Sequence, residues 1–334
     1  MPDSFTGPSG LPIPDSHLPA DRPLPPIHES GLPPDVHATV VAVGTFDGVH
    51  RGHRDVLDRL AARAAALDLR SVLVTFEPHP LEVVNPAAAP LLLTVGEEKR
   101  EVLAESGIDY LAVVPFTPAL ARFSAEEFVT RVLRERFRMK HLLMGYDHGF
   151  GRNREGDVET LQALGARDGF RVEVIPPVSV GDGRPISSTS IRRAIAGGDL
   201  DRATHALGRP YSVGGRVVPG ASRGRGLGFP TINLALPSPR KLLPPRGVYA
   251  VRVQTPGGAH GGMLNLGPRP TFGDEAIGIE AHLFDASGDW YGVWVRVDFI
   301  ARLRDTQKFP TPAALVEQLQ RDEAAARNAL VGVR

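Results

Sequence analysis

The chain has 334 residues, no cysteine, and 38 basic and 38 acidic side chains. Its length allows two domains with separate hydrophobic cores. A formal net charge of zero gives no electrostatic attraction to polyanions, so we expect no nucleic acid and no membrane as partner. The lack of cysteine excludes disulfide bonds and fits a reducing compartment. Because no apolar run approaches ~20 residues and no signal region begins the chain, we expect a cytoplasmic protein.

The first 36 residues differ in composition from the rest of the chain. They contain ten of the 31 prolines and almost no periodic apolar pattern. Such a segment cannot bury enough apolar surface to offset the conformational entropy lost on ordering. We predict a disordered, Pro-rich tail over residues 1–36, and a short ligand for a proline-binding partner remains an alternative.

Strands and helices alternate through the first half of the chain. Apolar runs typical of buried strands lie at 40–43, 71–76, 110–115, 141–145 and 172–175. Helical spacing of apolar residues follows at 56–67, with further helices indicated at 97–106 and 124–136. Ser124 and Glu127 match a capping box at the start of the last of these. The alternation predicts a parallel sheet with helices on both faces and ligands at the carboxyl ends of the strands.

A glycine- and histidine-rich stretch follows the first predicted strand. Residues 44–53 read Gly-Thr-Phe-Asp-Gly-Val-His-Arg-Gly-His and lead into a helix. Helix N-termini bind phosphate through free N–H groups, and glycine lets the backbone approach a ligand closely. His50 and His53 lie three residues apart, so their side chains project to similar sides. This pattern favours a phosphate-transfer site, while a plain glycine turn and a zinc site without a visible third ligand remain alternatives.

Two further segments carry polar residues in the first half of the chain. Residues 144–157 are rich in glycine and charge, and Asp147 lies among them. Residues 186–195 place the hydroxyls of Ser188 and Thr189 at the start of an amphipathic helix that includes Arg192.

Stretch 44–53 closely resembles the G-x-F-D-G-x-H-x-G-H signature of nucleotidylyltransferases, above all the adenylyltransferase module of bacterial bifunctional riboflavin kinase/FAD synthetases. Residues 144–157 resemble the loop G-x-(D/N)-F-x-F-G-x-x-R-x-G-D of that family, with His148 in place of the usual phenylalanine, and 186–192 resemble I-S-S-T-x-I-R. The resemblance implies a Rossmann-like nucleotidylyltransferase domain over 37–197 that transfers AMP from ATP to FMN. The ATP-binding residues that it implies are Gly44, Thr45, Phe46, Asp47, Gly48, His50, His53, Asp147, Ser188, Thr189 and Arg192, with His50 and His53 also catalytic.

The chemistry of that transfer explains why no base is visible in the first half. If the phosphate of FMN attacks the α-phosphorus of ATP, the nucleophile is already an anion and no proton has to be removed. The transition state then requires alignment and positive charge around the phosphate oxygens. Histidine, arginine, helix N-termini and Mg²⁺ are the expected sources of that charge.

The apolar period changes after residue 200. From Tyr211 the chain has short alternating strands with Gly and Pro turns, for example at 247–253 and 290–297. This texture predicts an antiparallel barrel or sandwich. Residues 312–330 have helical spacing and predict one closing helix.

A glycine-rich loop at 219–234 agrees with the riboflavin kinase loop R-G-R-x-L-G-F-P-T-(A/I)-N-L. The resemblance implies an antiparallel β-barrel riboflavin kinase domain over 203–331. In it, Gly226, Gly228, Thr231 and Asn233 bind ATP, and Thr231 and Asn233 are also the ligands of Mg²⁺, which prefers oxygen.

The strand at 277–284 alternates, so that Glu280 lies on the face opposite to Ile279 and Ala281. A glutamate on a strand is usually a surface residue. Here the resemblance places Glu280 at the catalytic glutamate of I-E-x-H-L-F-D, and a ribityl hydroxyl must lose a proton as it attacks ATP, so we predict a general base.

Three segments near the C-terminus complete the resemblance. Residues 264–272 resemble N-I-G-x-R-P-T-F, and 303–309 resemble the flavin loop L-R-x-E-x-K-F. Arg304 is the implied flavin-binding residue, and Thr306 stands where glutamate is usual. Asp322 and Arg327 fit the pattern D-x-x-x-A-R, in which we expect a structural ion pair.

The sequence therefore predicts an α/β plus all-β enzyme that phosphorylates riboflavin to FMN and adenylylates FMN to FAD. Its expected partners are riboflavin, FMN, FAD, ATP and Mg²⁺, and we expect a monomer or weak homo-oligomer. Two alternatives remain: one module has lost activity, with His148 and Thr306 as the departures to test, or the protein binds flavin without turnover.

Overall fold

The computed structural model describes residues 31–145, 149–152, 155–176, 185–220, 223–268 and 277–331. These residues fall into two compact units, which we call the sheet unit and the barrel unit. The sheet unit comprises the described residues up to Leu91 and Lys99–Ser187, and the barrel unit comprises Leu92–Glu98 and the described residues from Ser188 on. The first 30 residues of the predicted tail lie outside the described residues.

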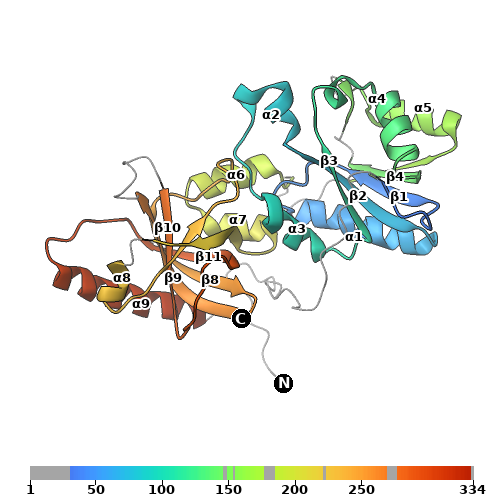
Figure 1. The fold of residues 1–334 in the computed structure, drawn as a ribbon. Helices are drawn as coiled ribbons and strands as arrows, with labels where there is room; N and C mark the ends of the chain where they lie inside the picture. The colour runs from blue at the N-terminus through green and yellow to red at the C-terminus, as the bar shows by residue number, and fades with distance from the viewer. Residues whose placement is uncertain are drawn as a thin grey trace. The chain divides into compact units, whose positions relative to one another are not determined.

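The sheet unit is built on parallel strands, four of which are labelled in Figure 1, and the strand order is β3-β2-β1-β4-β5. The strands are β1 (Thr39–Val43), β2 (Arg70–Glu77), β3 (Tyr110–Pro115), β4 (Met139–Gly145) and β5 (Arg171–Ile175). At the centre, Val41 of β1 pairs with Val72 of β2 on one side and with Leu142 of β4 on the other. The predicted parallel sheet is confirmed, with each strand close to its expected bounds.

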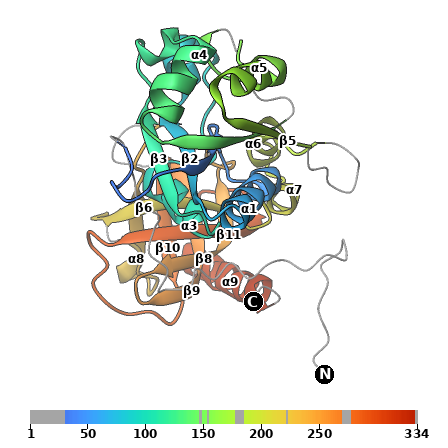
Figure 2. The same cartoon turned by 90° about the vertical axis from the view of Figure 1, so that its right-hand side faces the viewer.

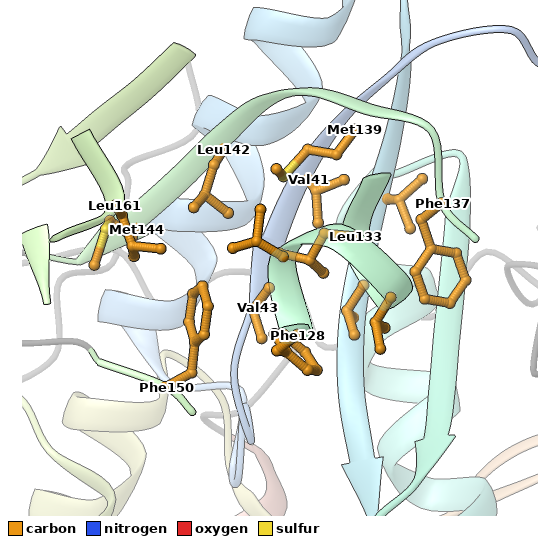
Figure 3. Close-up of a cluster of buried hydrophobic side chains, with 14 of the residues drawn as sticks. Val41, Val43, Phe128, Leu133, Phe137, Met139, Leu142, Met144, Phe150 and Leu161 are labelled. Atoms are coloured by element: carbon orange, nitrogen blue, oxygen red, sulfur yellow. The ribbon is translucent and has the colours of Figure 1, made fainter. Parts of the chain in front are cut away.

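Helices cover both faces of this sheet (Figure 2). The helices of this unit are α1 (Arg51–Ala66), α2 (Pro80–Val84), η1 (Pro86–Ala88), α3 (Gly96–Ala104, which begins in the barrel unit), η2 (Leu120–Arg122), α4 (Ala125–Glu127), η3 (Phe128–Arg134) and α5 (Val158–Asp168). Val41 and Val43 pack against a cluster that includes Phe128 and Leu161 (Figure 3). The alternate residues Val40 and Ala42 face the other side, where α1 supplies Leu57 and Leu60. A strand buried on both faces is continuously apolar, as the sequence of β1 is.

The helix predicted over 124–136 begins as expected but continues differently. Ser124 accepts a hydrogen bond from the N–H of Glu127 at 3.0 Å, and the Glu127 carboxylate accepts one from the N–H of Ser124 at 3.0 Å, which completes the capping box. After one turn, η3 is a π-helix: the N–H of Glu135 bonds to the carbonyl of Thr130, five residues earlier. The wider turn buries Val129, Val132 and Leu133 along with Phe128 in one cluster, a packing effect that no local pattern encodes.

Residues 31–36, which the sequence assigns to the tail, pack on the sheet unit. The guanidinium of Arg138 donates to the carbonyl of Pro33 at 2.8 Å and also to that of Val36. Leu32 packs against the cluster around Phe128, and Val36 is buried. The order comes from contacts with residues about 100 positions away, which composition does not reveal.

The barrel unit contains a closed barrel of antiparallel strands in the order β10-β7-β6-β11-β8-β9. Its strands are β6 (Tyr211–Val218), β7 (Ile232–Ala235), β8 (Gly247–Thr255), β9 (Gly258–Pro268), β10 (Ile277–Leu283) and β11 (Trp294–Arg304). Its helices are α6 (Ser188–Ala196), α7 (Leu200–Leu207), α8 (Arg223–Gly226) and α9 (Pro312–Val331). Helix α9 packs against β8, β9 and β11, as predicted for the closing helix (Figure 1). Neither α9 nor any other helix in the described ranges has the length and apolarity needed to span a membrane.

The strand predicted over 290–297 begins later, at Trp294. Residues 290–293 form a turn, in which the N–H of Tyr291 donates to the Asp289 carboxylate at 3.0 Å. Gly292 adopts φ 77°, a conformation that ends an extended strand. The predicted start of this strand was wrong because apolar residues also alternate through the turn that precedes it.

A buried ion pair fixes the segment Leu92–Glu98 in the barrel unit. The ammonium of Lys241 lies 2.8 Å from a carboxylate oxygen of Glu98, and both side chains are fully inaccessible. Lys241 also donates to the carbonyl of Leu93 at 2.5 Å, and the hydroxyl of Ser212 donates to Glu98 at 2.9 Å. The Tyr211 ring lies 4.6 Å from the ammonium. A buried charge is tolerable only with such partners.

Replacing Glu98 with alanine is expected to destabilise the barrel unit by about 3–5 kcal/mol, because Lys241 keeps a buried charge without its counter-ion. Both tryptophans, Trp290 and Trp294, lie in this unit, so their fluorescence during urea denaturation measures its unfolding. The double variant Glu98→Leu with Lys241→Met is the matched control and should recover most of the loss. Equal destabilisation of the single and double variants contradicts the account.

Candidate active sites

The turn after β1 has an unusual backbone. Phe46 and Val49 adopt positive φ angles of 45° and 42°, and Gly48 adopts 82°. Left-handed conformations are rare for bulky and especially β-branched residues, and such strain concentrates at functional sites. Asp47, at the centre of the turn, is buried. The local geometry therefore supports a ligand-binding role over a plain connecting turn.

His50 and His53 are brought together at the start of α1. His50 is the N-cap, and its Nδ1 accepts a hydrogen bond from the N–H of His53 at 3.3 Å. The two imidazoles stack with their centroids 3.6 Å apart, and the ring of Phe46 lies 4.8 Å from that of His53. Because Nδ1 of His50 is an acceptor, its neutral form carries the proton on Nε2. The pair thus projects to one side, as predicted.

Lys99 of α3 is a residue of this site that the sequence analysis did not identify. Its ammonium donates to the carbonyl of Thr45, in the turn, at 2.7 Å and to the hydroxyl of Thr75, in β2, at 2.9 Å. Loss of hydration lowers the pKa of Lys99 to about 8, although the negative charges of Asp47 and Glu77 oppose this shift. A lone lysine on a helix carries no sequence signal for such a position.

The remaining predicted residues of this site are placed differently. Asp147 and His148 lie outside the described residues. Ser188, Thr189 and Arg192 lie in α6, which belongs to the barrel unit. The predicted amphipathic stripe of α6 is confirmed, since Ile191, Ala194 and Ile195 are its buried residues. Whether the hydroxyls and Arg192 join the stretch 44–53 in one site stays a prediction.

In the barrel, strand register places Glu280 between two asparagines. Glu280 of β10 is directly opposite Asn233 of β7 and directly opposite Asn265 of β9. Directly opposed residues of antiparallel strands lie on the same face with Cβ atoms about 4.5–5.5 Å apart. Glu280 is partly accessible and Asn233 is buried. Two of the predicted site residues are therefore neighbours, and Asn265 joins them although the sequence analysis gave it no role.

The glycine-rich loop at 219–234 leads into the row of side chains formed by Asn233, Glu280 and Asn265. Gly228 adopts φ 84°, which favours glycine, and the N–H of Phe229 bonds to the carbonyl of Gly224 at 2.8 Å. Nδ1 of His282, two residues after Glu280, lies 2.7 Å from the carbonyl of Pro230. The loop is thereby held against β10, and Thr231 immediately precedes β7.

A pocket of about 640 Å³ adjoins Thr231. Its lining includes Val217 of β6, Leu283 of β10, and Trp290 and Tyr291 of the turn before β11. Aromatic and aliphatic walls with a hydroxyl at the border suit a ligand with one flat apolar part and one polar part.

Arg304 is engaged by helix α9. Its Nε and Nη2 donate to the carboxylate of Asp322 at 2.8 and 2.6 Å, and Nη1 donates to the carbonyl of Asp305 at 2.8 Å. Asp322 is therefore ion-paired, as expected, but with Arg304 and not with Arg327. Arg327 instead pairs with Asp285 at 2.8 Å and with Glu323 at 2.9 Å. A flavin-binding role of Arg304 stays a prediction.

Comparison with known proteins places both halves of the chain. The FAD synthetase model matches residues 32–190, and the riboflavin kinase model matches residues 207–330. The chain is 40% identical to the bifunctional riboflavin kinase/FMN adenylyltransferase of Pseudomonas fluorescens, over 89% of this chain and 94% of that protein. It is 39% identical to the bifunctional riboflavin kinase/FMN adenylyltransferase of Escherichia coli strain K12, over 86% and 91%. A crystal structure described as a macrolide-efflux protein from Streptococcus pneumoniae is 32% identical, with a TM-score of 0.78 over 91% of this chain and 99% of that chain.

Replacing Gly220 with alanine is expected to disturb Asn233, because a Cβ at this position overlaps the side-chain amide and lies 2.5 Å from its Cγ. Phosphorylation of riboflavin should fall by roughly 100-fold, the cost of a misplacement of about 1 Å at a reacting site, while adenylylation of FMN is unchanged. Gly257→Ala is the matched control, since its Cβ makes only an ordinary 3.7 Å contact with Thr255. Steady-state rates of the two conversions provide the check, and unaltered phosphorylation in Gly220→Ala removes Asn233 from the site.

Proposed function

Because the chain belongs to the bifunctional riboflavin kinase/FMN adenylyltransferase family, we propose that residues 203–331 phosphorylate riboflavin and residues 37–197 adenylylate FMN. The enzyme converts riboflavin and ATP to FMN, and then FMN and a second ATP to FAD and pyrophosphate. The observation that carries the assignment of the first step is the row of Asn233, Glu280 and Asn265, which the strand register brings together in the unit that also holds the pocket lined by Thr231. We further expect a monomer or weak homo-oligomer in the cytoplasm.

In the kinase step, Glu280 accepts the proton of the ribityl hydroxyl as that oxygen attacks the γ-phosphorus of ATP. The hydroxyl is neutral, so a carboxylate within hydrogen-bonding reach raises its nucleophilicity. The bond from the γ-phosphorus to the β,γ-bridging oxygen breaks and ADP leaves. Asn265, beside Glu280 in the row, is suited to orient the hydroxyl or the carboxylate.

The pocket and the glycine loop are suited to hold the nucleotide. Trp290 and Tyr291 offer flat walls for the base, and Thr231 marks the end at which the phosphates lie, beside Gly226 and Gly228. The hydroxyl of Thr231 and the amide oxygen of Asn233 are hard donors of the kind that fit Mg²⁺, and the buried Asn233 side chain is held against Gly220. When bound, Mg²⁺ neutralises charge on the phosphates.

In the adenylyltransferase step, a phosphate oxygen of FMN attacks the α-phosphorus of ATP. A P–O bond forms there and the bond to the departing pyrophosphate breaks, with no proton to remove. The N–H at Nε2 of His50 and the imidazole of His53 stabilise negative charge on the phosphate oxygens. The main chain of the strained turn 44–48 contacts the nucleotide, and the family resemblance assigns further contacts with ATP to Asp147, Ser188, Thr189 and Arg192.

Arg304 is proposed to act at the flavin end of the kinase site. Its three donor nitrogens are engaged by Asp322 and by the carbonyl of Asp305. These contacts fix the start of the loop at 303–309 relative to α9. We therefore assign Arg304 to holding this loop in the conformation that receives the flavin ring.

Incubation of the protein with ATP and Mg²⁺ tests the function directly, with riboflavin in one reaction and FMN in another. Chromatography should detect FMN and FAD from riboflavin, and FAD from FMN. Omission of Mg²⁺ should abolish both conversions. A single conversion identifies an inactive module, and bound flavin without ATP consumption supports the binding protein without turnover.

Reciprocal variants test the division of labour. Glu280→Gln should lower riboflavin phosphorylation by about 10²–10⁴-fold, the usual contribution of a general base, and leave FMN adenylylation intact. His53→Ala should impair adenylylation alone. Each variant is the control for the other, because both activities are measured on one polypeptide. Kinase activity near the wild-type level in Glu280→Gln shows the base assignment to be wrong, and equal loss of both activities in His53→Ala points to a structural role.

A further inference from the structure

The ammonium of Lys99 lies where the ligands of a parallel sheet bind. Its acceptors are the carbonyl of Thr45, just after β1, and the hydroxyl of Thr75, two residues before the end of β2. The hydroxyl of Thr75 in turn donates to the carbonyl of Thr45 at 3.2 Å. Ligands of open parallel sheets bind at the carboxyl ends of the strands. Lys99 therefore joins the two strand ends at the turn that carries His50 and His53.

The ammonium of Lys99 has more hydrogen-bond donors than it has acceptors around it in the described residues. An ammonium has three N–H groups. Two of them have acceptors, and among the described residues the third has none. A purely structural link between Thr45 and Thr75 needs two donors, which a neutral amine already supplies.

The charge of Lys99 is also incompletely balanced. The carboxylates whose fields act on it are Asp47, in the turn, and Glu77, at the end of β2. Their attraction favours the charged form, but desolvation is the larger effect and lowers the pKa of Lys99 to about 8. A partly desolvated cation of this kind gains from an anion that supplies both charge and an acceptor.

We propose that Lys99 is a further substrate-binding residue of the adenylyltransferase site, whose third N–H donates to a phosphate oxygen of ATP or of FMN. This inference rests on the proposed location of that activity in the sheet unit. The contacts with Thr45 and Thr75 hold the ammonium in place, and the third N–H and the positive charge remain for the substrate. Neither nucleophilic attack nor proton transfer is assigned to Lys99.

The proposal predicts a dependence on pH. Below a pH of about 8 Lys99 is charged and has its third N–H, and above it the amine keeps only the two donors that its protein acceptors use. FMN adenylylation should therefore decline as the pH rises through about 8. Arginine stays protonated throughout this range, so Lys99→Arg should lack the decline.

The experiment compares Lys99→Met and Lys99→Arg in the full-length protein with Lys140→Met as control. Lys140 lies on an exposed position of β4, in the same unit. Lys99→Met should lower kcat/KM for FMN adenylylation by about 10–100-fold, the usual worth of a hydrogen bond to a charged group. Lys99→Arg should retain most activity and Lys140→Met all of it. Riboflavin phosphorylation by the same samples should be unchanged, which shows that the barrel unit is folded, and an unchanged far-UV circular dichroism spectrum shows that the sheet unit keeps its secondary structure.

Separate saturation curves identify the substrate that Lys99 binds. A rise in KM for ATP alone assigns the contact to the triphosphate, and a rise for FMN alone assigns it to the flavin phosphate. An unchanged kcat/KM in Lys99→Met, with wild-type adenylylation present, overturns the proposal. If Lys99→Met does not fold, the pH profiles decide: an equal decline, or none, in wild type and Lys99→Arg also overturns it. Absence of adenylylation in the wild type instead refutes the proposed function.

Discussion

The ion pair of Glu98 and Lys241 ties the segment Leu92–Glu98 to the barrel unit. Its partners are separated by 143 residues and both are fully inaccessible. The pair is tolerated because each charge has a further partner. The Glu98 carboxylate accepts a hydrogen bond from the hydroxyl of Ser212, and the Lys241 ammonium donates one to the carbonyl of Leu93. If Glu98 and Lys241 did not meet, each would leave an unpaired buried charge. The pair therefore favours the position of Leu92–Glu98 in the barrel unit, although the sequence neighbours of this segment belong to the sheet unit.

The periodic elements were predictable because their signals are local. The strands of the sheet unit are apolar runs, and the stripe of α6 at Ile191, Ala194 and Ile195 follows helical spacing. Elements defined by distant contacts were not predictable. The π-helix η3 depends on how Phe128 and its neighbours pack, and the order of residues 31–36 depends on Arg138. The start of β11 at Trp294 was not predicted correctly for a related reason. Apolar and polar residues continue to alternate through the turn made by Asp289 and Gly292.

Site residues divide in the same way. The family motifs contain His50, His53, Asn233 and Glu280. In the structure, His50 and His53 are neighbours at the start of α1, and Asn233 and Glu280 are neighbours through the register of β7 and β10. Asn265 requires knowledge of which strand lies beside β10. Lys99 requires the fold of the turn and of β2, because a lysine in the first turns of an amphipathic helix ordinarily points to solvent. Tertiary structure is what distinguishes it from the other lysines.

The two reactions impose opposite demands on their sites, and the chain meets them with different residue types. An attacking hydroxyl must lose a proton, and the barrel presents a carboxylate, Glu280, flanked by neutral amides that do not compete for that proton. An attacking phosphate brings negative charge instead, and a carboxylate base there adds repulsion without removing anything. The turn after β1 and the start of α1 present imidazoles, and α3 adds the ammonium of Lys99. The one acidic residue of the turn, Asp47, is buried, and its charge favours the charged form of Lys99. With the site residues proposed above, the charge of the nucleophile explains why a base is needed in one half of the chain and cations in the other.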